Sequence, residues 1–304
     1  MTALPDVDGD DWIELTARAA FASHRLVGWI YWDPVAIDHY TALGPDAFSY
    51  YIATRGASLA GAGNEAVAAA FYSINPSFVS VCLDNCRAAT TFEQAALARD
   101  RGVVEGLHTH VPEICDGLAE LADPLWAAAD TLPMSGRVLA ASLRERARPD
   151  DPLLSAWLAV NCIREWRGDT HWAIQLAEGL GQVAVGILDG AARGYADDWL
   201  PRSRGADDAA LAHAFAELEA RGLAVDGAVT AAGLDDKLDL EIRLDRLSSP
   251  AWRSLGAGAT ARFLDLVEPV GDRLVARIAA PAGPNWMPAA RSRVTGRPRT
   301  GDGG

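Results

Sequence analysis

The sequence predicts a mainly α-helical protein with only short β-hairpins. Proline, glycine and aspartate breaks recur at regular intervals, and few stretches alternate apolar and polar residues as strands do. Half of the 304 residues are hydrophobic and 22% are charged, which is typical of a globular protein with a sizeable core. No apolar run is long enough to span a membrane, and the acidic N-terminus lacks the apolar stretch of a signal peptide. We therefore expect a cytoplasmic protein without a membrane partner.

The first half of the chain is expected to form a helical domain over residues 11–147. Asp33-Pro34 is a start signal inside it, because an aspartate N-cap and a proline at the first helical position both favour a new helix. The helices expected here cover residues 11–31, 46–55, 64–73, 76–88 and 91–121, the last interrupted near Pro112, followed by one between Asp123-Pro124 and Pro133.

The four cysteines are expected to be reduced and buried as small apolar residues. Cys82 and Cys86 would share one face of a helix, but no second pair of ligands at metal-binding spacing accompanies them. The segment HTHVPEIC (108–115) contains metal-ligand residue types, yet its two histidines diverge on a helix and Pro112 disrupts the geometry. We expect no metal site.

A second domain is expected over residues 150–256. The loop at 148–152 begins a helix that runs from about 153 to 166. Gly168 is expected to end this helix as its C-terminal cap, and Asp169 to begin the next helix as its N-cap. Another helix is expected at 182–192. The motif EWRGDTHW (165–172) is thus interpreted as a corner between two helices.

Residues 207–247 have the order helix, small hairpin, helix. An amphipathic helix ends at Arg221-Gly222, and the pair Asp226-Gly227 suits a two-residue hairpin, because both positions adopt positive φ at low cost. A further helix then covers 234–247. This order is how a winged helix-turn-helix ends, so the predicted fold is a helical N-terminal domain plus a winged-helix-like C-terminal domain.

The C-terminal region changes in character. The apolar runs at 262–270 and 272–280 predict a β-hairpin extension over 257–280. The remaining residues, 281–304, are rich in proline, glycine and arginine and are expected to form a disordered tail.

Several stretches resemble a known family. FAELEARGLAVDGAVTAAG (215–233) resembles the wing of MarR-like winged-helix regulators. The run from 134 through 163–180 to 248–256 is similar to a poorly characterised actinobacterial family of MarR-like helix-turn-helix proteins, with the R-G-D-x-H core as its most specific element. The family's N-terminal pattern is matched by Pro34, Tyr40, Arg55 and Leu59. The resemblance covers residues 15–256 and implies transcriptional regulation.

Charge argues against DNA binding. The chain has a net charge of −14, and a surface of that sign repels nucleic acid unless basic residues are segregated. Residues 206–247 contain ten acidic residues against four basic ones (Arg221, Lys237, Arg243 and Arg246), where a DNA-binding protein needs positive charge. We expect that nucleic-acid binding has been lost.

Two clusters are candidates for a small-molecule site. The first is WIYWDPVAIDHY (29–40) with Arg55 downstream, in which His39 is a candidate general base, Arg55 an anion anchor, and Trp32 and Tyr40 candidate ligand contacts. A helix interface rich in tryptophan and tyrosine, with Asp33 as a cap, explains the same residues.

The second cluster is EWRGDTHW. If Asp169 caps a helix, His171 lies in its first turn, where the helix dipole disfavours the charged imidazolium and leaves a neutral base. Asp169 and His171 are therefore candidate catalytic residues, and Trp172 a candidate ligand contact. Arg164 and Arg167 could anchor a carboxylate or phosphate. An arginine–aspartate ion pair across a tight corner between the two helices would explain the same residues.

No cofactor motif is present: the sequence lacks a phosphate loop, a dinucleotide-binding fingerprint and a nucleophile elbow. We therefore expect a small-molecule-binding protein of winged-helix ancestry, one form of which is an enzyme of secondary metabolism with a histidine base and an arginine anion anchor. The alternative is a MarR-like, ligand-responsive transcriptional regulator. A third interpretation is a structural partner in a homodimer.

Overall fold

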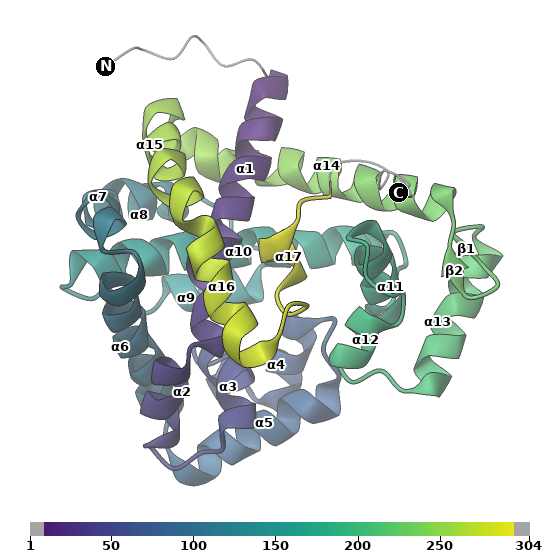
Figure 1. The fold of residues 1–304 in the computed structure, drawn as a ribbon, viewed down its shortest axis with the longest axis horizontal. Coiled ribbons are helices and arrows are strands. Elements are labelled where there is room, and N and C mark those ends of the chain that lie inside the picture. The colour runs from purple at the N-terminus through teal and green to yellow at the C-terminus, as the bar shows by residue number, and fades with distance from the viewer. Residues whose placement is uncertain (1–8, 295–304) are drawn as a thin grey trace.

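The computed structural model describes residues 9–294, and nearly all of its regular elements are helices (Figure 1). The helices are α1 (Gly9–Gly28), α2 (Pro34–Thr41), α3 (Tyr50–Arg55), α4 (Asn64–Phe71), α5 (Pro76–Ala89), α6 (Phe92–His110), α7 (Cys115–Ala119), α8 (Ala122–Asp130), α9 (Val138–Arg144), α10 (Pro152–Ala177), α11 (Gln182–Ala192), α12 (Trp199–Ser203), α13 (Asp208–Ala220), α14 (Ala231–Leu255), α15 (Ala257–Val267), α16 (Gly271–Ala282) and α17 (Pro288–Arg291), and the strands are β1 (Ala224–Val225) and β2 (Ala228–Val229). The predicted mainly α-helical class is confirmed.

The predicted hairpin between two helices is present. Strands β1 and β2 pair antiparallel between α13 and α14, with Ala224 opposite Val229. The turn residues Asp226 and Gly227 have φ angles of 50° and 75°, as a two-residue hairpin of this twist requires. Thr230 caps α14, because its hydroxyl accepts a hydrogen bond from the Gly233 N–H. Local sequence therefore determines this part of the fold.

Helix α10 lies across the middle of the molecule and packs against α1, α7, α8, α9 and α14 (Figure 1). The largest hydrophobic cluster extends from α1 to α16 and includes the fully buried Trp29, Trp157, Trp166 and Trp252. A second cluster joins the end of α10 to α11, α13, the hairpin and α14. Since α10 and α14 contribute to both clusters, they join α11, α13 and the hairpin to the rest of the protein.

The expected break at Gly168 and Asp169 is wrong, because α10 continues without interruption to Ala177. Asp169 does cap a helix, but a different one. Its Oδ2 accepts hydrogen bonds of 3.1 and 3.0 Å from the N–H groups of Leu139 and Ala140, in the first turn of α9. Arg137, at the N-cap position of α9, makes no capping bond from its own side chain. The capping residue is thus supplied from another part of the chain.

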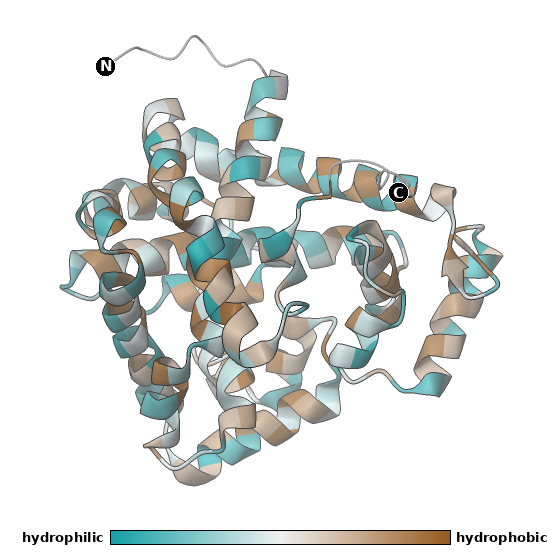
Figure 2. Ribbon diagram, in the orientation of Figure 1, coloured by the Kyte–Doolittle hydropathy of each residue, from teal (hydrophilic) through white to brown (hydrophobic). Residues whose placement is uncertain are grey.

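The predicted β-hairpin over 257–280 is also wrong, since this region forms α15 and α16. Figure 2 shows hydrophobic and hydrophilic residues mixed along both helices. The buried positions repeat every three or four residues, which is the helical period: Phe263, Leu264, Val267, Leu274 and Ile278. The sequence suggested strands because a short apolar run is compatible with both a strand and a buried helix.

The predicted disordered tail is corrected for residues 281–294. Helix α17 packs beside α1, where Arg25 donates a 2.9 Å hydrogen bond to the Ala290 carbonyl. Arg293 forms two hydrogen bonds of 2.8 and 2.7 Å with Glu14. The rest of the predicted tail, 295–304, lies outside the described residues.

Within residues 9–294, none of the helices combines the length and hydrophobicity needed to cross a lipid bilayer.

The capping role of Asp169 can be tested with two substitutions. Asp169→Ala removes the acceptor for two buried N–H groups, and we expect it to lower the free energy of unfolding by about 1 to 2 kcal/mol. Asp169→Asn keeps an acceptor oxygen at the same place, so it should retain most of this stability. Urea denaturation followed by tryptophan fluorescence measures both effects, and equal losses in the two variants would contradict the capping role.

The pKa of Asp169 also predicts that the stability of the protein depends on pH. Burial raises the pKa of Asp169 to about 7, although the N–H groups of Ala140 and Leu139 act in the opposite direction. The unfolded-state pKa of aspartate is about 3.9, so the folded protein holds this proton more tightly. Its contribution to stability is present below about pH 4 and is lost as the pH rises through 7. We expect the free energy of unfolding of the wild type to fall between pH 5 and 8 relative to that of Asp169→Asn. If the free energies of the two proteins change in parallel with pH, this prediction is wrong.

Candidate functional site

A cavity of about 160 Å³ lies where α3, α10, α11 and the segment 287–289 meet. We call it the arginine cavity. Among the described residues, five arginines and two carboxylates line it: Arg55, Arg164, Arg167, Arg193, Arg204, Glu165 and Asp189. In a chain of net charge −14, this is a segregated region of positive charge. Such a lining suits a negatively charged ligand.

Glu165 forms ion pairs with two of these arginines. The Nε and Nη2 atoms of Arg55 donate hydrogen bonds of 2.7 and 2.8 Å to the two carboxylate oxygens, and Arg164 contacts the same carboxylate. The Glu165 side chain is only 1% exposed. Burial alone would raise its pKa, but Arg164 and Arg55 hold the pKa at about 2. This cluster is therefore a buried, fully ionised bridge between α3 and α10.

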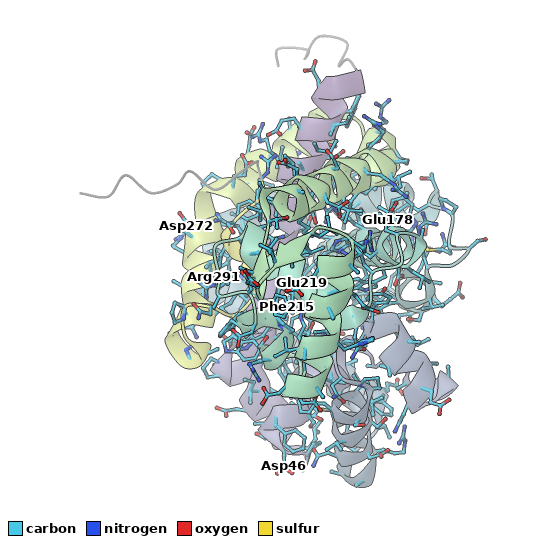
Figure 3. The ribbon with its side chains drawn as sticks, turned by 90° about the vertical axis from the view of Figure 1, so that its right-hand side faces the viewer. Asp46, Glu178, Phe215, Glu219, Asp272 and Arg291 are labelled. Atoms are coloured by element: carbon cyan, nitrogen blue, oxygen red, sulfur yellow. The ribbon has the colours of Figure 1, made fainter. Side chains whose placement is uncertain are left out.

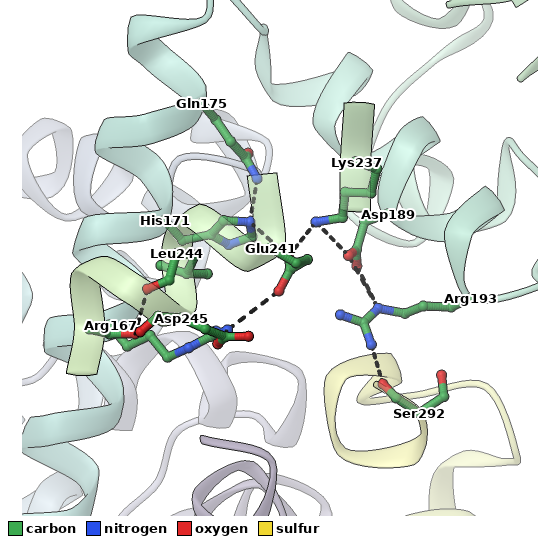
Figure 4. A network of polar contacts seen from close by, with 11 residues as sticks. Arg167, His171, Gln175, Asp189, Arg193, Lys237, Glu241, Leu244, Asp245 and Ser292 are labelled. Carbon is green, nitrogen blue, oxygen red and sulfur yellow. Dashed lines mark hydrogen bonds and ion pairs between the residues drawn. The ribbon is translucent and has the colours of Figure 1, made fainter. Parts of the chain in front are cut away.

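A second buried network ties α10, α11 and α14 together (Figure 4). Lys237, with its side chain 1% exposed, places Nζ 2.6 Å from Glu241 and 3.1 Å from Asp189. Arg193 donates two hydrogen bonds to the same Asp189. Burial would lower the pKa of Lys237, but Glu241 and Asp189 raise it above its usual value. Most charges in this network are thus balanced within the protein.

Arg167 connects this network to the cavity. Its Nη2 lies 2.8 Å from Asp245 and 3.4 Å from Glu241, while its Nε has no hydrogen-bond partner. The helical spacing of three residues puts Arg164 and Arg167 on one face of α10. Arg167 therefore still has one donor to offer.

His171 lies on the same face of α10, well inside the helix rather than in a first turn, so its predicted position is wrong. Its Nε2 contacts the Gln175 amide and lies 3.4 Å from Glu241 (Figure 4). Burial, and then the charge of Lys237, lower its pKa to about 3. The imidazole is neutral near pH 7, as expected, but burial is the main cause and no helix N-terminus is involved. Its ring stacks on Trp172 at 5.1 Å.

The structure brings together only part of the predicted site. The predicted residues that line the arginine cavity are Arg55, Arg164, Arg167, His171 and Trp172. Asp169 points instead to α9. The first cluster does not join them: His39 lies 2.8 Å from Glu105 on α6, and the buried Tyr40 hydroxyl lies 2.7 Å from that of Ser49. Trp32 lines a neighbouring cavity.

Several residues of the cavity lining had no predicted role, among them His24, Arg193 and Arg204, which lie in separate segments and belong to no motif. Tyr31 lies in the aromatic cluster 29–40 but was not itself predicted as a site residue. Among the described residues, seven buried side-chain polar atoms lack a hydrogen-bond partner, and four of these belong to the cavity lining: His24 Nδ1, Tyr31 OH, Arg167 Nε and Arg204 Nη1. Buried polar groups are nearly always hydrogen-bonded, so this concentration makes the cavity the candidate site.

Arg204 differs from the other cavity arginines. It forms no ion pair with any residue in the described part of the chain. Burial lowers the pKa of its guanidinium, and Asp189 opposes this only in part. A guanidinium remains charged in proteins even so. Arg204 is therefore an unbalanced positive charge beside three other unpartnered polar atoms.

Between residues 9 and 294, no group of three or more His, Cys, Asp and Glu side chains is placed so that it could hold a metal ion. The four cysteines are free and buried, as the sequence predicts.

Figure 3 shows Phe215 and Glu219 on the face of α13 that is turned toward the viewer. Glu217 and Glu219 are exposed, and Glu219 accepts a 3.1 Å hydrogen bond from Gly227 at the tip of the hairpin. The two basic candidates are already occupied: His213 lies 3.3 Å from Glu217, and Arg221 donates to the Glu178 carbonyl. This face offers little positive charge to a phosphate backbone.

Comparison with known proteins gives one match. A family model described as a helix-turn-helix family matches residues 16–281. Neither the curated proteins nor the solved structures contain a match. The match covers most of the chain and extends from α1 to the end of α16. The chain therefore belongs to this helix-turn-helix family.

Proposed function

We propose that this helix-turn-helix protein binds a small organic anion in the arginine cavity, and that its winged-helix part has lost DNA binding. One observation carries the proposal: four of the seven unpartnered buried polar atoms in the described residues line a single, positively charged cavity. Three of these atoms belong to groups that can donate a hydrogen bond to an anion, those of Tyr31, Arg167 and Arg204.

The ion pairs indicate which arginine would hold the anion. Arg55 and Arg164 share the carboxylate of Glu165, and Arg193 shares that of Asp189 with Lys237. Arg204 is the cavity arginine without such a partner among the described residues. We therefore assign Arg204 as the main anchor, with the Arg167 Nε and the Tyr31 hydroxyl as further donors.

Catalysis by His171 is a second hypothesis for the same cavity. The imidazole lines the cavity and is neutral, as a general base must be. However, its Nε2 already contacts Gln175, so a substrate proton would have to be within reach of Nδ1. Proton abstraction by His171 is needed only if the protein is an enzyme, for example one of secondary metabolism.

The anchor can be tested with simple anions and two matched variants. We expect acetate, phosphate and citrate at saturating concentration to raise the Tm of the wild type by a few °C, because a ligand that binds only the folded state stabilises it. Arg204→Met should abolish the shift without lowering its own Tm, since Arg204 makes no ion pair that would be lost. Arg202→Met is the control, because Arg202 is exposed and pairs with Asp198 outside the cavity. Equal shifts in Arg204→Met and wild type would refute the assignment.

The second candidate is a MarR-like, ligand-responsive transcriptional regulator. It is favoured by the family match and by the intact order of α12, α13 and hairpin. In this case the helical remainder of the chain would sense the ligand, and α13 would lie in the major groove. The acidic surface of α13 argues against it.

DNA binding distinguishes the two candidates. We expect no sequence-specific shift in gel mobility at 150 mM salt with DNA from upstream of the protein's own gene. The double variant Ala216→Lys and Glu217→Lys, which adds charge at two exposed positions of α13, should gain non-specific binding that disappears as salt rises. A specific shift by the wild type, resistant to competitor DNA, would establish the regulator instead.

A further inference from the structure

A second, larger cavity borders the arginine cavity. Its volume is about 340 Å³ and its lining is mostly apolar and aromatic, so we call it the aromatic cavity. Six residues line both cavities: Tyr31, Tyr51, Ile74, Arg204, Met287 and Pro288. The two spaces are therefore neighbours that share one wall. The volume of the aromatic cavity lies within the range usual for small-molecule sites.

Three tryptophans from distant parts of the chain form much of the aromatic cavity. The ring centroid of Trp286 lies 5.9 Å from that of Trp32 and 5.9 Å from that of Trp199. Trp32 in turn lies 5.6 Å from Tyr51. These separations are those of packed aromatic pairs, and a flat ring inserted among them would find both faces and edges to pack against.

The polar end of this arrangement is at the shared wall. Tyr31 and Arg204 line both cavities, and each carries an unpartnered buried atom, the Tyr31 hydroxyl and the Arg204 Nη1. Tyr31 is only 3% exposed, so its hydroxyl cannot be satisfied by bulk solvent. A ligand that lay in the aromatic cavity and carried an acidic group at one end would place that group beside both atoms.

We propose that the two cavities form one binding site for an aromatic organic acid. The acidic group would bind Arg204 and Tyr31, and the ring would lie among Trp32, Trp199 and Trp286. This inference rests on the proposed anion binding and adds the chemical class of the ligand. Charge selects an acid over a neutral compound, and the tryptophan walls select a ring over an aliphatic chain.

The C-terminal segment completes the site. Trp286 belongs to the aromatic cavity, and Met287 and Pro288 line both cavities. The segment is held in place by Arg193, which donates to the Ser292 carbonyl, and by the hydrogen bond from Arg25 to Ala290. These residues lie beyond position 281, where the family match ends. The ring specificity of this site therefore depends on a segment outside the matched region.

The test compares probes that differ in one property. 2-Naphthaleneacetate is an aromatic acid, its amide lacks the charge, acetate lacks the ring, and octanoate replaces the ring by a chain. We expect isothermal titration calorimetry to show that the wild type binds 2-naphthaleneacetate about 10- to 100-fold more tightly than the amide, as a charged hydrogen bond would provide. Acetate and octanoate should both bind more weakly than 2-naphthaleneacetate.

Two variants separate the two ends of the ligand. Arg204→Met should weaken binding of 2-naphthaleneacetate to the level of the amide and leave the affinity for the amide unchanged. Trp286→Ala should weaken both aromatic probes and leave acetate unchanged. Arg202→Met, on the same short helix region but outside both cavities, should match the wild type with every probe.

Each contrary result has a distinct meaning. If acetate binds as tightly as 2-naphthaleneacetate, the anion site stands and the shared site is refuted. If the amide binds as tightly as the acid, Arg204 is not the anchor and the acid class is refuted. If octanoate binds most tightly, the aromatic class is refuted. If no aromatic probe binds while phosphate still stabilises the protein through Arg204, this inference fails and the proposed function survives.

Discussion

The buried ion pair between Glu165 and Arg55 is the interaction on which the candidate site depends. It joins α3 to α10 in a place where both partners are removed from water, so each charge would be costly without the other. The same carboxylate also pairs with Arg164, so this cluster of two arginines and one glutamate keeps an excess of positive charge. Arg204 adds a further positive charge that takes part in no ion pair among the described residues. The site thus consists of an ion-paired frame with excess positive charge and one arginine outside the ion pairs.

The unbroken course of α10 explains how one short motif serves several structural roles. Arg164, Arg167 and His171 are separated by three and four residues, so they share the face toward the cavity and α14. Glu165 and Asp169 are also four residues apart and lie on another face, toward α3 and α9. A break at Gly168 would have scattered these groups. The continuous helix instead distributes them between a binding surface and two structural bonds.

The sequence predicted what short-range signals determine. The Asp226-Gly227 turn was identified correctly because its residues meet a local backbone requirement. Asp169 carried a true capping signal, but its partner is thirty residues away, which no local pattern reveals. The strands expected over 262–280 failed because short apolar runs fit two periods, and only packing against α1 and neighbouring helices decides between them. Arg204 and Tyr31 were missed because their importance arises from unpartnered atoms in the folded chain.

The burial of Lys237 has a practical consequence for handling the protein. It is the single lysine of the chain, and its ammonium group is enclosed by Glu241 and Asp189. Amine-directed dyes, biotin esters and lysine crosslinkers therefore have no side-chain target in the folded protein, apart from the α-amino group. Modification of Lys237 would require the packing between α11 and α14 to open. The rate at which a slow amine reagent labels this residue would consequently report how often this packing opens under native conditions.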